Sequence, residues 1–216
     1  MVRTASPLPL DDAVALSRTG DLWLFRGRSA ADRAIQAVTN APVNHVGMAL
    51  VIEDLPPMMW HAELGSSLRD LWTGDRHRGV QLHDLREAVV RWQQDYGQAA
   101  WLRQLDPVAG RSEEDAALRA VARLDGVSFP SAARLAGRWL RGRDGYLPRR
   151  RREGQRPRPE AAYCAEVVAL TLQEMGLVRD DRKAHWYDPG TFWSGEYLPL
   201  APGVSYGLEV PVGRAP

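Results

Sequence analysis

The sequence predicts an α+β protein, with strand patterns mainly in its first part and a more helical middle. Four apolar or alternating runs have the length of strands, and they lie at 22–25, 45–52, 58–64 and 79–82. A helix is expected over 116–124, after the acidic start at Ser112, and another over 160–175, which Gly176 ends. No internal repeat of 20–50 residues is visible.

Length and composition limit the class of protein. The chain has 216 residues, enough for one domain or a domain with a small appendage. It is 44% hydrophobic and 25% charged, which excludes wholesale disorder. Its 28 basic residues nearly balance 27 acidic residues, so we expect no nucleic-acid partner for the chain as a whole.

The ends and the apolar runs indicate location. The amino-terminal segment has no apolar core of signal-peptide length and is interrupted by Asp11 and Asp12. The longest apolar stretch, 46–52, has strand length, so no membrane span is expected. The sequence therefore predicts a cytoplasmic protein, where a free thiol is stable.

Turn signals place the first elements. Residues 1–19 indicate an irregular lead-in, and Ser29 starts a capping-box pattern for a helix. Pro56-Pro57 separates two strand patterns and predicts a hairpin between them. In the second of these strands, Met59, His61 and Glu63 share one face. The other face carries Met58, Trp60, Ala62 and Leu64.

The whole chain, 1–216, is predicted to be one domain with two additions. A helical insertion is expected at about 86–141, with extra helices in its 110–141 part. An arginine-rich loop with eight arginines is expected at about 141–159. This loop is interpreted as a solvated excursion, with a phosphate-binding patch as the alternative.

Cys164 is the one cysteine, which excludes an internal disulfide and a multi-thiolate zinc site. It falls near the start of the helix predicted from Pro159. The positive end of the helix dipole is expected there to lower the thiol pKa. The alternative is that Cys164 is a small core residue of a helix that is apolar nearly all round.

A thiol nucleophile needs a base, and five histidines are available. His45 opens the most apolar strand, and Gly47 and Ala49 on its face would let a helix backbone approach closely. The alternative is a core histidine. His77 and His83 lie among polar residues and are expected at the surface, and His185 falls in a loop-like stretch.

His61 and Glu63 share a face of the strand that follows His45. If the hairpin forms, either side chain could hold the imidazole of His45 in its productive tautomer. The alternative is two polar residues on the solvated face of an edge strand. The residues alone leave both interpretations open.

Five segments together resemble the circularly permuted NlpC/P60 group of papain-like proteins, of the YiiX/LRAT type. They cover about 18–85 and 160–210, and the histidine precedes the cysteine by 119 positions, as the permuted order requires. The segments are Gly20-Asp21-Leu22-Trp23-Leu24-Phe25-Arg26-Gly27, Asn44-His45-Val46-Gly47-Met48-Ala49, Met59-Trp60-His61-Ala62-Glu63, Gly79-Val80-Gln81-Leu82 and Tyr163-Cys164-Ala165-Glu166-Val167-Val168-Ala169.

The resemblance implies a small antiparallel sheet or open barrel with the cysteine-bearing helix packed on it. It implies Cys164 as nucleophile and His45 as general base. The third position is commonly glutamate in permuted members; here it is His61, with Glu63 two residues later. Tyr163 precedes the cysteine as in the family, and its vicinity is implied to help stabilise the oxyanion. No metal or organic cofactor is implied.

The function implied is acyl transfer through a thioester, as in an amidase, a peptidase or an acyltransferase. The substrate would be a small-molecule, peptide or lipid acyl compound. One alternative is an inactive papain-fold module that binds a peptide or lipid in the same cleft. Another is binding of phosphate-rich partners by the arginine-rich loop.

Overall fold

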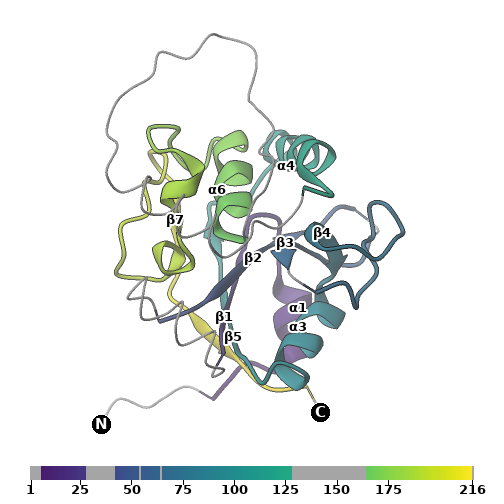
Figure 1. The fold of residues 1–216 in the computed structure, drawn as a ribbon. Coiled ribbons are helices and arrows are strands. Elements are labelled where there is room, and N and C mark those ends of the chain that lie inside the picture. Colours follow the sequence, from purple (N-terminus) through teal and green to yellow (C-terminus); the bar gives the residue numbers. More distant parts are fainter. Residues whose placement is uncertain (1–5, 28–41, 54, 64, 128–163, 216) are drawn as a thin grey trace.

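The computed structural model describes residues 6–27, 42–53, 55–63, 65–127 and 164–215 (Figure 1). The helix predicted from Ser29, the arginine-rich loop and Tyr163 lie outside these residues. Within the described part of the chain, no helix is long and apolar enough to cross a membrane.

The core of the fold is a six-stranded antiparallel sheet in the order β4-β3-β2-β1-β5-β8. Residues 105–106 and 205–206 form a separate two-stranded pair, β6 (Leu105–Asp106) with β7 (Ser205–Tyr206). The strands of the main sheet are β1 (Leu22–Arg26), β2 (His45–Leu50), β3 (Met58–Glu63), β4 (Gly79–Asp84), β5 (Ala99–Arg103) and β8 (Val210–Val212). The hairpin predicted around Pro56-Pro57 is confirmed, because β2 and β3 pair antiparallel.

Helices cover both faces of this sheet (Figure 1). On one face lie α4 (Arg111–Leu124) and α6 (Cys164–Glu174). On the other lie α1 (Leu10–Leu16) and α3 (Leu85–Gln94). Two short 3-10 turns, η1 (Ala184–Trp186) and η2 (Pro189–Phe192), follow α6. The fold is therefore α+β, as predicted.

Strand alternation determines which side chains meet which helices. In β2, Val46, Met48 and Leu50 lie in the apolar cluster that contains α6, whereas Ala49 lies in the cluster that contains α3. The α6 layer is also tied by a polar contact, because Trp60 Nε1 donates to Thr171 Oγ1 at 2.9 Å. The two faces thus have separate cores, and α6 is buried as its apolar sequence predicts.

Two predictions about the elements need correction. Residues 1–19 are not wholly irregular, because α1 forms at 10–16 with Leu10 and Ala13 buried on the sheet. The segment 86–141 is not simply a helical insertion. Between α3 and α4 it contains β5, which pairs with β1 inside the main sheet.

Candidate active site

Strand pairing brings the polar residues of β3 and β4 onto one face of the sheet. His61 pairs with Gln81, and Met59 pairs with His83. Directly paired residues point to the same side of an antiparallel sheet. That side is the one covered by α1 and α3, and His45 at the start of β2 points there too, because its ring stacks on Trp92 of α3.

A continuous chain of hydrogen bonds runs across these three strands. His45 Nε2 lies 3.0 Å from His61 Nδ1. His61 Nε2 lies 3.0 Å from His83 Nδ1, and His83 Nε2 lies 3.1 Å from Gln81 Oε1. The structure therefore places His61 against His45, as predicted, and adds His83 and Gln81 to the same chain of hydrogen bonds.

The direction of every proton in this chain follows from Gln81. Its Nε2 donates to the carbonyl oxygens of Gly65 and Gly79, both at 3.3 Å, which leaves Oε1 to accept from His83. His83 Nε2 must then carry its proton, and His83 Nδ1 accepts from His61 Nε2. His61 Nδ1 in turn accepts from His45 Nε2. A neutral His45 consequently keeps an unprotonated Nδ1.

The surroundings of the chain keep it neutral. Burial lowers the pKa of His45 to about 3 and that of His83 to about 4, and it holds the pKa of His61 well below its usual value. The ring of Trp92 stacks on His45, with centroids 3.7 Å apart, and helps to exclude water. At neutral pH these imidazoles are uncharged.

Glu63 lies beside His61. Its Oε1 accepts from the Tyr96 hydroxyl at 3.2 Å, and its Oε2 lies 3.8 Å from His61 Nε2. Burial raises the pKa of this carboxyl. Among the described residues, Oε2 makes no hydrogen bond of ordinary geometry, although the indole N–H of Trp92 interacts with this carboxyl and lowers its pKa in part. The interpretation of His61 and Glu63 as solvated residues of an edge strand was wrong, since both are buried and β3 is an interior strand.

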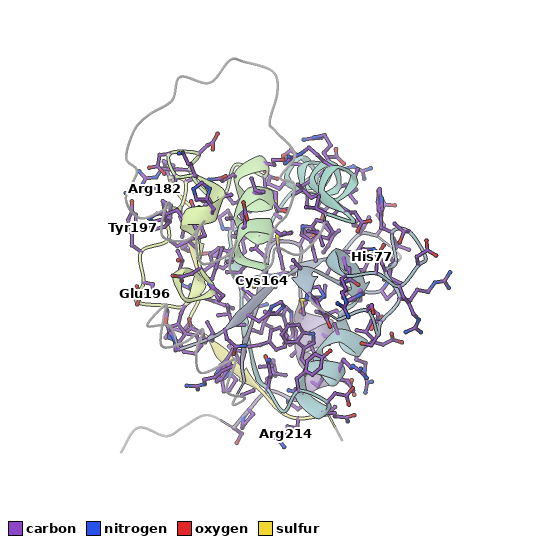
Figure 2. The ribbon with its side chains drawn as sticks, in the orientation of Figure 1. His77, Cys164, Arg182, Glu196, Tyr197 and Arg214 are labelled. Carbon is purple, nitrogen blue, oxygen red and sulfur yellow. The ribbon has the colours of Figure 1, made fainter. Side chains whose placement is uncertain are left out.

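Cys164 is the first described residue of α6, and Figure 2 shows it at the end of that helix next to the sheet. The backbone N–H groups of Val46 and Ala165 lie against its sulfur and lower the thiol pKa, but burial outweighs them and raises it to about 11. The expected lowering by the helix dipole is therefore not found. Within the described part of the chain, no hydrogen bond joins Cys164 to His45; the two are linked through Val46, the residue after His45.

The small residues beside His45 have a different role from the one expected. A Cβ at Gly47 would lie 2.2 Å from the sulfur of Met59, so the missing side chain makes room for β3. The helix that carries Cys164 packs instead on the opposite face, against Val46 and its neighbours. The expectation that Gly47 and Ala49 admit the cysteine-bearing helix was wrong.

Sequence reasoning missed three members of this cluster: Gln81, His83 and Trp92. His83 was expected at the surface, yet it is only 1% exposed. The signal that could have found it is the alternation of β4, which puts Gln81 and His83 on one face opposite His61. His77 is half-buried beside Asp70, with Nε2 3.5 Å from Oδ2, and lies toward the surface in Figure 2.

Two groups of described residues could hold a metal ion. One is His61, Glu63 and His83, and the other is Asp70, His77 and Asp125. In each group the potential ligand atoms lie within 4.8 Å of one another. The first group belongs to the buried face described above.

The antiparallel sheet with helices on both faces defines a small α+β protein and is consistent with a papain-like fold. Among solved structures, the chain is similar to the metalloprotein yiiX from Escherichia coli O157:H7, a DUF1105 protein, with a TM-score of 0.51 and 16% sequence identity. The match covers 89% of this chain and 97% of yiiX. No protein-family model and no curated protein sequence matches the chain. The similarity between this chain and yiiX is a similarity of fold.

Proposed function

We propose that this protein is a cysteine-dependent hydrolase or acyltransferase, with Cys164 as nucleophile and His45 as general base. The observation that carries the proposal is the hydrogen-bond chain from His45 to Gln81. It fixes His45 as the tautomer with a free Nδ1. Cys164 begins α6, and its sulfur meets the backbone N–H of Val46, the residue that follows His45 in β2, so the nucleophile and the base lie at the same end of that strand.

The chemistry starts from a neutral thiol and a neutral imidazole, because burial raises the pKa of Cys164 and lowers that of His45. His45 Nδ1 takes the thiol proton as the sulfur attacks the carbonyl carbon of an ester or amide. His45 then gives this proton to the departing alcohol or amine, leaving a thioester on Cys164. Water or a second nucleophile attacks the thioester and releases the acyl group.

His61 acts as the positioning residue of the site. By accepting from His45 Nε2, it holds the imidazole in one orientation and favours the tautomer that can act as a base. Backbone N–H groups close to the sulfur, those of Val46 and Ala165, are candidates to stabilise the oxyanion. The His45 ring stacks on Trp92 on the α3 side of the sheet, whereas α6 packs on the other side, so the proposed step requires the imidazole to turn toward Cys164 when substrate binds.

The substrate proposed is a small-molecule, peptide or lipid acyl compound, and a cytoplasmic location remains a prediction. The similar structure yiiX is described as a metalloprotein. The proposed thiol chemistry of this chain routes no step through a metal. Tyr163, implied near the oxyanion, lies outside the described residues, so its role also remains a prediction.

The experiment is turnover of nitrophenyl acyl esters and anilides by purified protein. We expect Cys164→Ala to abolish turnover, and His61→Ala to lower kcat more than it changes KM. His77→Ala is the matched control: it removes a histidine outside the hydrogen-bond chain and should leave turnover unchanged. Turnover that persists in Cys164→Ala would overturn the proposal.

A second candidate is an inactive papain-fold module that binds a peptide or lipid in the same place. It is favoured by the raised thiol pKa and by the absence, among the described residues, of a hydrogen bond between Cys164 and His45. This candidate predicts that no ester or anilide is turned over. It also predicts that binding of a peptide or lipid ligand survives in Cys164→Ala.

A further inference from the structure

A buried carboxylate oxygen without a hydrogen bond is the starting point. Glu63 is only 4% exposed, and within the described residues its Oε2 makes no hydrogen bond of ordinary geometry, although the indole N–H of Trp92 interacts with this carboxyl. Burying a carboxylate costs free energy unless it is paired, bonded or bound to a metal. The atoms that this oxygen faces therefore indicate what would satisfy it.

Oε2 of Glu63 faces two imidazole nitrogens. His61 Nε2 lies 3.8 Å from Oε2 and 3.0 Å from His83 Nδ1. All three ligand atoms lie within 4.8 Å of one another. Nitrogen and oxygen ligands bound at about 2.0–2.2 Å to one tetrahedral zinc ion lie about 3.3–3.5 Å apart. Shifts of a few tenths of an ångström would give His61 this spacing to both partners, and the ligand atoms of Glu63 and His83, within 4.8 Å of each other, would approach by up to about 1.4 Å.

Each of the three side chains is already held in an orientation that suits a ligand. Gln81 accepts from Nε2 of His83, so Nδ1 of His83 keeps its lone pair toward the group. Tyr96 donates to Oε1 of Glu63 and leaves Oε2 free. His45 lies against Nδ1 of His61. Outer contacts of this kind orient the ligands of protein metal sites.

We propose that His61, Glu63 and His83 form a binding site for a divalent transition-metal cation, of which zinc is the best match. Two imidazoles and one carboxylate form a ligand set used for zinc, and three protein ligands leave a fourth position for water. The positive charge of the bound cation would neutralise the buried carboxylate of Glu63. The site does not depend on Cys164 or on the proposed thiol chemistry.

Metal binding and the hydrogen bond between His61 and His83 are alternative uses of His61 Nε2. In the metal-free protein this nitrogen carries a proton that His83 accepts. When a cation takes its lone pair, the proton of His61 moves to Nδ1, which then donates to Nε2 of His45, and the proton of His45 moves from Nε2 to Nδ1. The metal-bound chain therefore lacks the free Nδ1 that the proposed thiol chemistry uses. His83 needs no such change, because its proton already lies on the nitrogen that faces Gln81.

The other group of potential ligands is a weaker candidate. Asp70 already accepts from the backbone N–H and the hydroxyl of Thr73 through Oδ2, and from the backbone N–H of Leu82 through Oδ1. Its carboxylate is therefore satisfied without a metal, unlike that of Glu63. His77 in this second group supplies the matched control for the test.

The test is zinc binding by the full chain after removal of metal with a chelator. Competition with a chromophoric chelator gives Kd, and we expect one zinc ion per chain. Glu63→Gln and His83→Gln should each weaken binding at least about 100-fold, more than the loss of an outer contact does. His77→Ala and Cys164→Ser should bind as the native chain does. Native-like binding by Glu63→Gln, or loss of binding in His77→Ala, would overturn the proposal.

A spectroscopic measurement on the native chain covers the case in which a variant fails to fold. Cobalt(II), added as the probe, should give visible bands of nitrogen and oxygen ligation without the intense thiolate charge-transfer band. A cobalt titration that yields no visible bands overturns the proposal, and so does a thiolate band. Neither readout requires an enzymatic activity, so the metal site and the proposed function can fail separately.

Discussion

The three buried histidines predict a steep loss of stability in acid. In the unfolded chain a histidine has a pKa of about 6.5 and takes up a proton as the pH falls below that value. In the folded chain, burial lowers the pKa of His45 to about 3 and that of His83 to about 4. Stability is therefore complete above about pH 6.5 and falls as the pH drops through this window. Between pH 8 and pH 5, each of these two histidines should cost about 2 kcal/mol of unfolding free energy. His61 adds a cost of the same sign.

The assay is urea unfolding of the metal-free protein at pH 8 and pH 5. We expect a loss of about 4 kcal/mol or more at pH 5, with an unchanged dependence on urea concentration. The raised carboxyl pKa values of Glu63 and Asp21 act in the opposite direction and reduce this loss. His83→Gln should reduce it by about 2 kcal/mol. Equal unfolding free energies at the two pH values would refute the reasoning.

Three further predictions concern packing and the thiol. Gly47→Ala forces a Cβ against Met59 and should lower the unfolding free energy by about 1–3 kcal/mol; an unchanged urea midpoint would contradict this. Trp60→Phe removes the hydrogen bond to Thr171 and should cost about 1–3 kcal/mol in the same assay, whereas a smaller loss would mean that this contact does not hold α6 to the sheet. Alkylation of Cys164 by iodoacetamide should accelerate about tenfold per pH unit from pH 7 to 10, since burial raises the thiol pKa to about 11; a rate that levels off below pH 8 would show a lower pKa.

Local patterns were sufficient to predict the hairpin of β2 and β3, which carries part of the site. The alternation of β3 and the turn at Pro56-Pro57 predict the hairpin, and the hairpin brings His61 to His45. These signals lie within about twenty residues of one another, so pairing follows from the strand pattern and the turn.

Contacts across longer distances were not predictable in the same way. His83 looks polar in its local sequence, and only pairing with β3 and cover by α3 bury it. The pKa of Cys164 depends on how deeply α6 packs, which outweighs the effect of the helix end. The strand β5 was missed because its partner, β1, lies more than seventy residues earlier in the chain.

The most direct test of the account is the rate at which an activated acyl ester forms a thioester on Cys164. Intact-mass measurement after rapid quenching follows this adduct, and any thiol adduct belongs to the one cysteine of the chain. We expect a single acyl adduct on the native protein, none on Cys164→Ala, and adduct formation at least about 100-fold slower on His45→Ala. Equal rates for the native protein and His45→Ala would contradict the role of His45 as the base that activates Cys164.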